Sequence, residues 1–473
     1  MKKLLIFAVA ALLAASGMAQ TKHISILSVN DMHAAIENFP KFAALADSLK
    51  KVDPELIILS AGDNRTGNPY NDMYAIPSYP MTALMNAVGF KASALGNHEW
   101  DNKIDGLRTQ MALSSFPYLC SNVELPDSIN LPIAPYKFFT VNGVRVGILG
   151  AIQTSVLGIP DSHPNNLKGL KFTPHDEVIP NYKWMRDQCD VLLLLSHDGY
   201  EDDVETANKF GWFDAIIGGH THTKVQNNDI HNGVLVTQAK NKLSFATLTK
   251  MDIENGKVTC KTSELIDVKA FSSENKDIAK LVDLFSQNEK LKEKVVDVDR
   301  DFQGWEELGN MMCDAILNET GSEVSLQNGG GVRFETFPAG PMLVEDILKL
   351  DPFGNEAVVY EMTGKEIADL IQNCFYTDEK QVPYVGGITY EMTINKSMEP
   401  TGIKIKMADG SKFDMKRKYK FVTNSYVSSI VTSKHADPGT STYRPCSDLM
   451  LDYLPKQGHI DYQGTHRATI IEK

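Results

Sequence analysis

The residues of this chain that could do chemistry follow short apolar runs, and the clearest set is segment 96–101, Gly-Asn-His-Glu-Trp-Asp. Asn97 offers a neutral oxygen ligand for a metal ion, and His98 is free to act on a substrate. Asp101, three residues after His98, could hold its imidazole in one tautomer. Because the apolar run 92–95 comes directly before this motif, we expect the motif at the carboxyl end of a strand.

Further apolar runs end in the same way, in side chains that can hold a metal ion. These side chains are Asp31 and His33, then Asp63, then His197, then His220 and His222. Each motif alone could be an ordinary turn, but five of the twelve histidines fall in these motifs. Carboxylate, amide and imidazole ligands together suit Zn, Mn, Fe or Co better than an all-oxygen Mg site.

The elements that must position these residues alternate between β-like runs and helical segments. Residues 41–51, 80–88 and 175–188 have helical character and separate several of the apolar runs. This alternation predicts an α/β domain with helices covering a sheet. Ligands of such sheets bind beyond the carboxyl ends of the strands, where the sequence places every residue named above.

Length and charge limit the class of protein. The 473 residues exceed what one core usually serves, so two domains are expected. A net charge of −13 argues against a nucleic-acid partner and against an anionic membrane surface. The expected partner is a small molecule.

The N-terminus predicts export. A basic start and the apolar run 4–15 lead to small residues at Gly17 and Ala19, which is typical of a signal peptide over residues 1–19. The run is shorter than the roughly 20 residues that span a bilayer, so no membrane insertion is expected after cleavage. The mature protein should be periplasmic or secreted.

Six scattered cysteines form neither a zinc ribbon nor a disulfide scaffold. We expect mostly buried thiols, although export leaves pairing open.

The order of the first motifs resembles that of the calcineurin-like metallophosphoesterases, over residues 24 to 238. This resemblance implies a four-layered α/β/β/α sandwich with two divalent metal ions. It places Asp31, His33 and His222 at the first ion, Asn97, His197 and His220 at the second, and Asp63 between them. His98 would contact the phosphate and protonate the leaving oxygen, oriented by Asp101.

This ligand set explains the expected reaction. Two divalent ions roughly 3.5–4 Å apart polarise the phosphoryl oxygens and bind a water whose pKa falls towards neutrality. The resulting hydroxide would attack phosphorus in line. Only a carboxylate has two oxygens and the charge to bridge both ions, so Asp63 should be the most sensitive ligand.

The second half carries a different pattern. Asn328 and Arg333 flank three glycines, a loop that could bring backbone and a guanidinium to an anion or a planar base. Together with the turn at Phe353 and the helix start at Thr363, this half resembles the C-terminal domain of the exported 5′-nucleotidases and UDP-sugar hydrolases. The resemblance implies that Asn328 and Arg333 contact base and phosphate or sugar groups. It also implies that Phe353 and Tyr426 sandwich the base, with Asn355 near its edge.

The predicted organisation has four parts. A signal peptide (1–19) precedes a metallophosphoesterase domain (20–270), a charged linker helix (271–297) and an α+β substrate-specificity domain (298–473). Since one domain would bind the substrate and another the metals, we expect the linker to allow rotation.

Two departures from the family leave the substrate open. Residues 427–438 lack the Gly-Gly-Asp-Gly turn that binds ribose hydroxyls, and Asp437 is no substitute for it. The family arginine before Leu308-Gly309-Asn310 is also missing, and residues 302–305 read Phe-Gln-Gly-Trp. The predicted function is therefore hydrolysis of 5′-nucleotides or a related phosphoester. UDP-sugars, 2′,3′-cyclic nucleotides and non-nucleotide phosphoesters are alternative substrates. A non-catalytic periplasmic protein that binds nucleotide or metal is a remote alternative.

Overall fold

Two sheets built from the apolar runs of the first half face each other across a shared core. The computed structural model describes residues 21–431 and 433–473, so the predicted signal peptide lies outside the described residues. Ile26 and Leu59 of the first sheet pack in one hydrophobic cluster with Ile148 and Leu193 of the second. These side chains are fully buried. Their packing removes the inner face of both sheets from water, which is the main stabilisation of a sandwich.

The first sheet has seven strands and the second has six. The first runs in the order β15 (Lys257–Asp267), β14 (Phe245–Glu254), β1 (Lys22–Val29), β2 (Ile57–Ser60), β3 (Ala92–Ala94), β4 (Tyr118–Leu119), β6 (Ile133–Ala134). The second runs β12 (Ile230–His231), β13 (Val234–Thr237), β11 (Ala215–Ile217), β10 (Val191–His197), β8 (Val144–Ile152), β7 (Tyr136–Val141). A short pair, β5 (Val123–Glu124) and β9 (Lys171–Phe172), lies outside both sheets.

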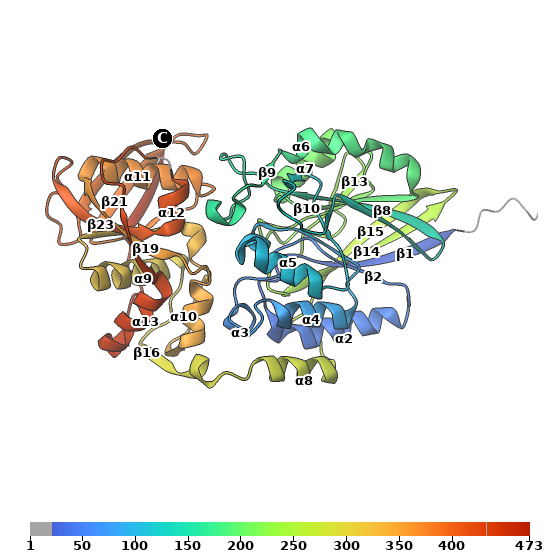
Figure 1. The fold of residues 1–473 in the computed structure, drawn as a ribbon, viewed down its shortest axis with the longest axis horizontal. Helices are drawn as coiled ribbons and strands as arrows, with labels where there is room; N and C mark the ends of the chain where they lie inside the picture. Colours follow the sequence, from blue (N-terminus) through green and yellow to red (C-terminus); the bar gives the residue numbers. More distant parts are fainter. Residues whose placement is uncertain (1–20, 432) are drawn as a thin grey trace, which may run out of the picture. The chain divides into compact units, whose positions relative to one another are not determined.

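Helices cover the two outer faces. On the second sheet, Ile179 and Met185 of η4 (Ile179–Gln188) and Ala207 of α7 (Tyr200–Lys209) bury Leu192 and Leu194. Figure 1 shows α6 (His175–Val178) and α7 on that side and α2 (Phe39–Lys50) and α4 (Tyr79–Val88) on the other. The predicted four-layered α/β/β/α sandwich is confirmed.

The parallel strands determine where the motifs lie. In the first sheet β1, β2, β3, β4 and β6 are parallel, and in the second β8, β10, β11 and β13 are parallel. The carboxyl ends of β1, β2 and β3 therefore meet at one edge of their sheet, and those of β10 and β11 meet at one edge of theirs. The polar motifs follow these strand ends.

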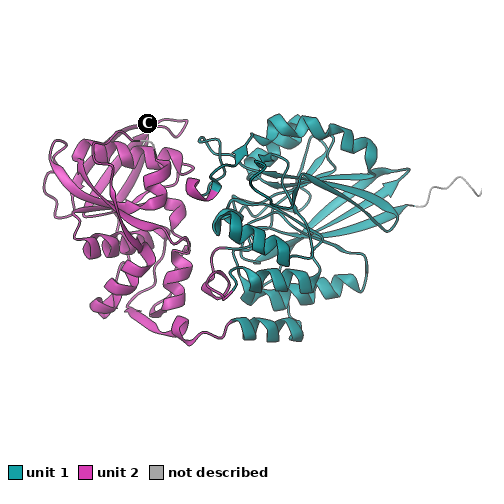
Figure 2. Cartoon of the chain, viewed as in Figure 1, with its two compact units in different colours: residues 1–65, 76–162, 167–285 teal, residues 66–75, 163–166, 286–473 magenta. Residues whose placement is uncertain are grey.

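The chain divides into two compact units, coloured separately in Figure 2. Unit 1 holds both sheets and includes α8 (Lys276–Phe285). α8 buries Ile278, Val282 and Phe285 and packs on α2 and α4. The linker helix predicted within residues 271–297 ends at Phe285, and a short 3-10 turn, η5 (Glu289–Lys292), follows. Unit 2 comprises Thr66–Ala75, which contains α3 (Pro69–Asp72), His163–Asn166 and Ser286–Lys473.

Unit 2 combines three sheets with helices, which confirms a second α+β domain. Its central sheet runs β20 (Tyr384–Gly386), β17 (Val324–Gln327), β23 (Lys418–Asn424), β19 (Glu356–Thr363), β24 (Thr440–Pro445). The smaller sheets are β18 (Gly340–Leu343), β16 (Lys294–Val298), β25 (His459–Ile460), and β22 (Pro400–Met407), β21 (Ile388–Ile394), β26 (Ala468–Glu472). The helices are α9 (Trp305–Thr320), α10 (Val344–Leu350), α11 (Gly364–Thr377), α12 (Ser425–Ile430) and α13 (Cys446–Gln457).

All six cysteines lie in the described residues and are unpaired. Cys120, Cys313, Cys374 and Cys446 are buried, Cys189 is half-buried and Cys260 is exposed. Burial raises the pKa of the Cys189 thiol to about 11 and also raises the pKa of the four buried thiols. Across the described part of the chain, no helix is long and apolar enough to cross a membrane.

Candidate functional site

The seven predicted metal ligands all lie at strand ends of unit 1. Asp31 and His33 follow β1, Asp63 follows β2, Asn97 opens the turn η2 (Asn97–Trp100) after β3, His197 ends β10, and His220 and His222 follow β11. Five of the seven have a positive φ: Asp31 48°, His33 44°, Asp63 53°, His220 77° and His222 54°. Non-glycine residues adopt this region at a cost in free energy, and such residues are enriched at functional sites.

One group of ligands brings two histidines against a carboxylate. The Nε2 atoms of His33 and His222 are 2.9 Å apart. The Oδ1 atom of Asp31 lies 3.5 Å from Nε2 of His222 and 3.9 Å from Nε2 of His33. Asp31, His33 and His222 thus direct three potential ligand atoms to one point.

A second group surrounds Asn97. Its Oδ1 atom lies 3.2 Å from Nε2 of His197 and 3.1 Å from Nδ1 of His220. Nε2 of His197 is also 3.2 Å from Oδ2 of Asp63. The two groups meet, since Nε2 of His197 is 3.9 Å from Oδ1 of Asp31.

The donor chemistry of these groups fits divalent cations. Nδ1 of His197 lies 2.6 Å from the backbone oxygen of Ala61, which can only accept, so Nδ1 carries a proton. In the neutral ring, Nε2 then presents a lone pair to the oxygens of Asp63 and Asn97. Facing lone pairs repel each other unless a proton or a cation lies between them. The residues therefore suit a metal ion on chemical grounds.

Charge at the site supports the same conclusion. Burial would raise the pKa of Asp63, but His197 and His98 hold it well below its ordinary value. Burial would likewise raise the pKa of Asp31, and His222 lowers it. Burial would lower the pKa of His197, yet Asp63 and Asp31 raise it to about 10, so without a cation a second proton on Nε2 would lie between the ring and these oxygens. Two buried carboxylates are thus kept ionised, and they require nearby positive charge.

His98 lies beside the ligand groups with one nitrogen already engaged. Its Nδ1 is 2.8 Å from Oδ2 of Asp101, the partner that the sequence predicts. Its Nε2 faces the site, 3.8 Å from Oδ2 of Asp63. The backbone N–H of His98 also donates to Oδ1 of Asp63 at 2.9 Å. The ring is therefore held with Nε2 directed at the metal-ligand groups.

Glu99 organises the loops that carry these ligands, and the sequence analysis did not assign it a role. Its buried carboxylate accepts hydrogen bonds from the backbone N–H groups of Asp63 (2.9 Å), Asn64 (2.9 Å) and Gly96 (2.7 Å). Burial, and after it the Asp63 carboxylate, raise the pKa of Glu99 to about 7. An acidic residue in the centre of a buried motif was the available signal, but two of its three partners, Asp63 and Asn64, lie in a different loop.

One glycine permits the close approach of two of these loops. A Cβ atom on Gly96 would lie 2.1 Å from Oδ1 of Asp63 and 2.6 Å from its backbone nitrogen. No larger residue fits there without displacing Asp63. The Gly96-Asn97-His98 segment therefore needs its glycine for steric reasons.

The predicted substrate residues lie in unit 2 on three separate segments. Asn328 and Arg333 follow β17, Phe353 and Asn355 precede β19, and Tyr426 lies in α12. The guanidinium carbon of Arg333 is 5.6 Å from the ring centre of Phe353, a cation–π distance. Oδ1 of Asn355 accepts a hydrogen bond from Ser425, the neighbour of Tyr426, at 3.3 Å.

Asn328 is buried in a hydrogen-bond network. Its Nδ2 donates to Oδ1 of Asp378 at 3.1 Å, and its Oδ1 accepts from Nδ2 of Asn424 at 3.0 Å. Asp378 also accepts from the backbone N–H of Gly330 at 2.9 Å. Asn424 in turn caps α12 by accepting from the N–H of Val427 at 2.8 Å. This network joins the glycine loop to the helix that carries Tyr426.

The fold and the site define a class, the calcineurin-like phosphoesterases, and the model of that family matches residues 24–224. The model of the 5′-nucleotidase C-terminal domain matches residues 286–431. Together the two models match more than half of the chain. The chain belongs to the 5′-nucleotidase family, a metal-dependent group of phosphoester hydrolases, as the resemblance predicted.

Relatives share this arrangement over most of their length. Protein UshA of Salmonella pullorum is 25% identical over 479 residues, which cover 86% of this chain and 85% of the relative. A 5′-nucleotidase of Vibrio cholerae is 26% identical over 424 residues, covering 74% of this chain and 75% of the relative.

Solved structures show the same fold. A 5′-nucleotidase precursor of Thermus thermophilus matches with a TM-score of 0.83 at 22% identity, covering 95% of this chain and 99% of that chain. The sulfate thiohydrolase SoxB of Thermus thermophilus matches with a TM-score of 0.79 at 15% identity, covering 95% and 96%. Proteins named for different reactions thus share this fold, so the substrate has to be inferred from this chain's own residues.

Proposed function

We propose that this protein is an exported 5′-nucleotidase that uses two divalent ions. The observation that carries this proposal is the convergence of the seven ligands at the strand ends of unit 1. Asp31, His33 and His222 would hold one ion, Asn97, His197 and His220 the other, and Asp63 both. Zn, Mn, Fe and Co all suit this donor set. The bound ions would supply positive charge to the phosphoryl oxygens and activate water near neutral pH.

His98 would act as the general acid. Asp101 accepts a hydrogen bond from the Nδ1–H group of His98 at 2.8 Å. The second proton of the protonated ring is therefore on Nε2, the nitrogen that faces the site. Transfer of that proton to the leaving oxygen would let the alcohol depart neutral as the phosphorus–oxygen bond breaks. His98 would then be neutral with Nδ1 still protonated, so Asp101 would keep it in the correct tautomer.

Unit 2 would recognise the nucleoside. Phe353 and Tyr426 would stack on the two faces of the base, and Asn355 would lie near its edge. Arg333, beside Phe353, would meet a phosphate or sugar oxygen. Since both polar ends of the Asn328 amide are engaged by Asp378 and Asn424, we assign Asn328 to holding the glycine loop in place.

A second substrate class is favoured by the missing ribose-binding turn. Asp437 accepts two hydrogen bonds, one at each carboxylate oxygen, from the N–H groups of Glu361 (2.7 Å) and Gly439 (2.9 Å). It therefore acts as a turn residue. UDP-sugars, 2′,3′-cyclic nucleotides and non-nucleotide phosphoesters form this second class.

The test is hydrolysis by the purified mature chain, residues 20–473. It is followed as phosphate from AMP, UMP and glucose 1-phosphate from UDP-glucose, adenosine 2′- or 3′-monophosphate from 2′,3′-cyclic AMP, and p-nitrophenol from p-nitrophenyl phosphate. AMP, UDP-glucose, 2′,3′-cyclic AMP and p-nitrophenyl phosphate would each be supplied with Mn or Zn, and with EDTA as the control. We expect release from AMP that stops with EDTA and returns with metal. Metal-dependent cleavage of p-nitrophenyl phosphate without cleavage of AMP would select the second class. Binding of AMP without turnover of any ester would make the protein a non-catalytic binder.

The proposal that the protein is exported is based only on the predicted signal peptide, residues 1–19. Osmotic-shock fractionation followed by N-terminal sequencing would test it. We expect the protein in the released fraction, beginning at Gln20. Retention in the cytoplasm with an intact Met1 would reject it.

A further inference from the structure

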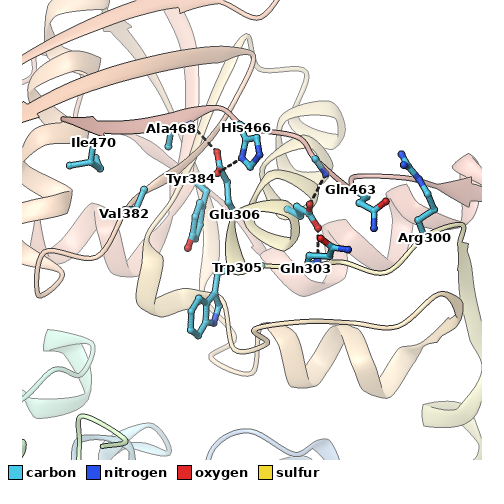
Figure 3. Close-up of a pocket in the computed structure, with 13 residues that line it drawn as sticks. Arg300, Gln303, Trp305, Glu306, Val382, Tyr384, Gln463, His466, Ala468 and Ile470 are labelled. Carbon is cyan, nitrogen blue, oxygen red and sulfur yellow. Dashed lines mark hydrogen bonds and ion pairs between the residues drawn. The ribbon is translucent and has the colours of Figure 1, made fainter.

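Unit 2 contains a pocket that none of the proposed metal or nucleotide residues lines. Its volume is about 760 Å³, within the range of roughly 300–1,000 Å³ typical of small-molecule sites. The lining residues come from the start of α9, from residues 382–384 and from residues 463–470 (Figure 3). Gln303 and Trp305, which line it, belong to the segment where this chain lacks the family arginine.

Two consecutive glutamates hold the walls of this pocket together. The carboxylate of Glu307 accepts from the N–H groups of Gln303 and Gly464, both at 2.6 Å. The carboxylate of Glu306 accepts from the N–H groups of Arg467 at 2.6 Å and Ala468 at 2.9 Å. The first turn of α9 is thereby tied to the segment before β26. The pocket is formed before any ligand binds, which lowers the entropy cost of binding.

The charged side chains around the pocket already have partners within the protein. Besides its backbone partners, Glu306 meets Nδ1 of His466 at 3.1 Å. Arg300 forms an ion pair with Asp461 at 2.6 Å. A charged ligand would have to compete with these partners, so the pairing favours an uncharged ligand.

The groups that remain are an aromatic face, two side-chain amides and an aliphatic wall. The Trp305 side chain is 47% exposed, although tryptophan is usually well buried. In Figure 3, Trp305 and Tyr384 extend in the same direction from their segments. Gln303 and Gln463 line the pocket with amides, although Nε2 of Gln463 already donates to the backbone oxygen of Asp301 at 3.3 Å. Val382, Ala468 and Ile470 bring apolar surface. Such a lining suits a ring with a flat apolar face and polar groups at its edge.

We propose that this pocket binds an uncharged ring compound, a hexose or a nucleoside, stacked on the indole of Trp305. None of the proposed metal ligands lines this pocket, and neither does Phe353 or Tyr426. Binding there needs no metal and no phosphate. The proposal therefore stands or falls independently of the 5′-nucleotidase activity.

The test measures binding by the metal-loaded mature chain with saturation-transfer NMR. Glucose, N-acetylglucosamine, adenosine and uridine are the probes, and glycerol is the control without a ring. We expect saturable binding of a hexose or a nucleoside. Trp305→Ala removes one stacking contact and should raise the Kd of the bound hexose or nucleoside about tenfold. Trp305→Phe, which keeps a smaller ring, should lose less affinity.

Matched controls separate this site from the rest of the molecule. Trp184→Ala removes another half-exposed tryptophan, 45% exposed in η4 of unit 1, and should leave the Kd unchanged. Phe353→Ala tests the proposed nucleoside site. The proposal would be overturned if nucleosides still bound to Trp305→Ala but not to Phe353→Ala, and if no hexose bound in a manner that depends on Trp305. Absence of saturable binding by all four ring probes would also overturn it.

Discussion

The metal-ligand groups of unit 1 and the proposed nucleotide residues of unit 2 are held in different ways. In unit 1 the ligands lie at the ends of buried parallel strands or shortly after them, and five of them have a positive φ. In unit 2 the residues come from a glycine loop, a turn and a short helix. Loops on a rigid scaffold tolerate change more readily than strand ends do. The difference implies that the chemistry of this chain is fixed by its backbone, whereas its substrate range depends on replaceable side chains.

The largest effect should follow from Asp63→Asn. Asp63 would hold both ions, and removing one group that stabilises transition-state charge costs about 10²–10³-fold in kcat. We therefore expect kcat to fall by about 10²–10³-fold on every substrate. Steady-state rates, with metal content measured by mass spectrometry, would check this. Asp252→Asn, which alters the exposed His23–Asp252 pair, is the matched control and should leave kcat unchanged. Near-normal turnover in Asp63→Asn would contradict the inference that the strand-end ligands of unit 1 determine the chemistry.

His98→Ala should have the next largest effect and should depend on the leaving group. Loss of a general acid costs about 10²–10⁴-fold in rate. We expect that loss with AMP, whose leaving alkoxide needs a proton, and a smaller loss with p-nitrophenyl phosphate, whose leaving phenolate needs none. Metal content should stay at the wild-type value, and His23→Ala is the control. Equal losses on both esters would remove His98 from the role of acid.

Phe353→Ala should affect only the substrate that carries a base. One stacking contact is worth about 1–3 kcal/mol, so kcat/KM for AMP should fall about 5- to 150-fold. The rate with p-nitrophenyl phosphate should not change, because all seven proposed metal ligands lie in unit 1. Tyr376→Ala, which removes another aromatic ring of unit 2 that is 46% exposed, is the control. A parallel loss on both esters would show that the two units are not independent in function.

The smallest effect on turnover should come from Asp351→Asn, whose main consequence is for stability. Burial raises the pKa of Asp351 to about 7 from an ordinary value of 3.8. The folded chain therefore keeps this proton up to about pH 7, while the unfolded chain releases it near pH 4. The free energy of unfolding should fall as pH rises between these values, by on the order of 2–4 kcal/mol.

Denaturant unfolding of both proteins at pH 4.5 and pH 8 would measure this. The amide introduced by Asp351→Asn has no proton to lose, so the variant should lack that part of the pH dependence and be more stable than wild type at pH 8. Other buried acids titrate equally in both proteins and cancel in the difference. Identical pH dependence in the two proteins would mean that Asp351 is ionised at neutral pH in the folded chain.

The strand-end groups could be predicted from sequence because one physical pattern repeats. An apolar run that ends in a ligand side chain places that side chain at a sheet edge, and parallel strands bring such edges together. The pairing of His98 with Asp101 follows from spacing of three residues and is present at 2.8 Å.

Other features could not be read in this way, because they depend on partners distant in sequence. Glu99 binds backbone groups 36 and 35 residues away, and Asn328 binds Asp378 and Asn424, 50 and 96 residues away. The pocket at Trp305 needs residues 463–470 to close it. The helix end at Phe285 escaped prediction because charged residues beyond it are compatible with a continued helix.

The exposure of the cysteines has a practical consequence. Among the six thiols, four are buried and Cys189 is half-buried with a raised pKa, which keeps it from forming the reactive thiolate. Cys260, exposed on β15, is left as the position that a maleimide reagent should modify first. A fluorophore or spin label could thus be attached to the unaltered protein at one defined place on unit 1. With a second label on a cysteine introduced in unit 2, the distance between the two units could be measured.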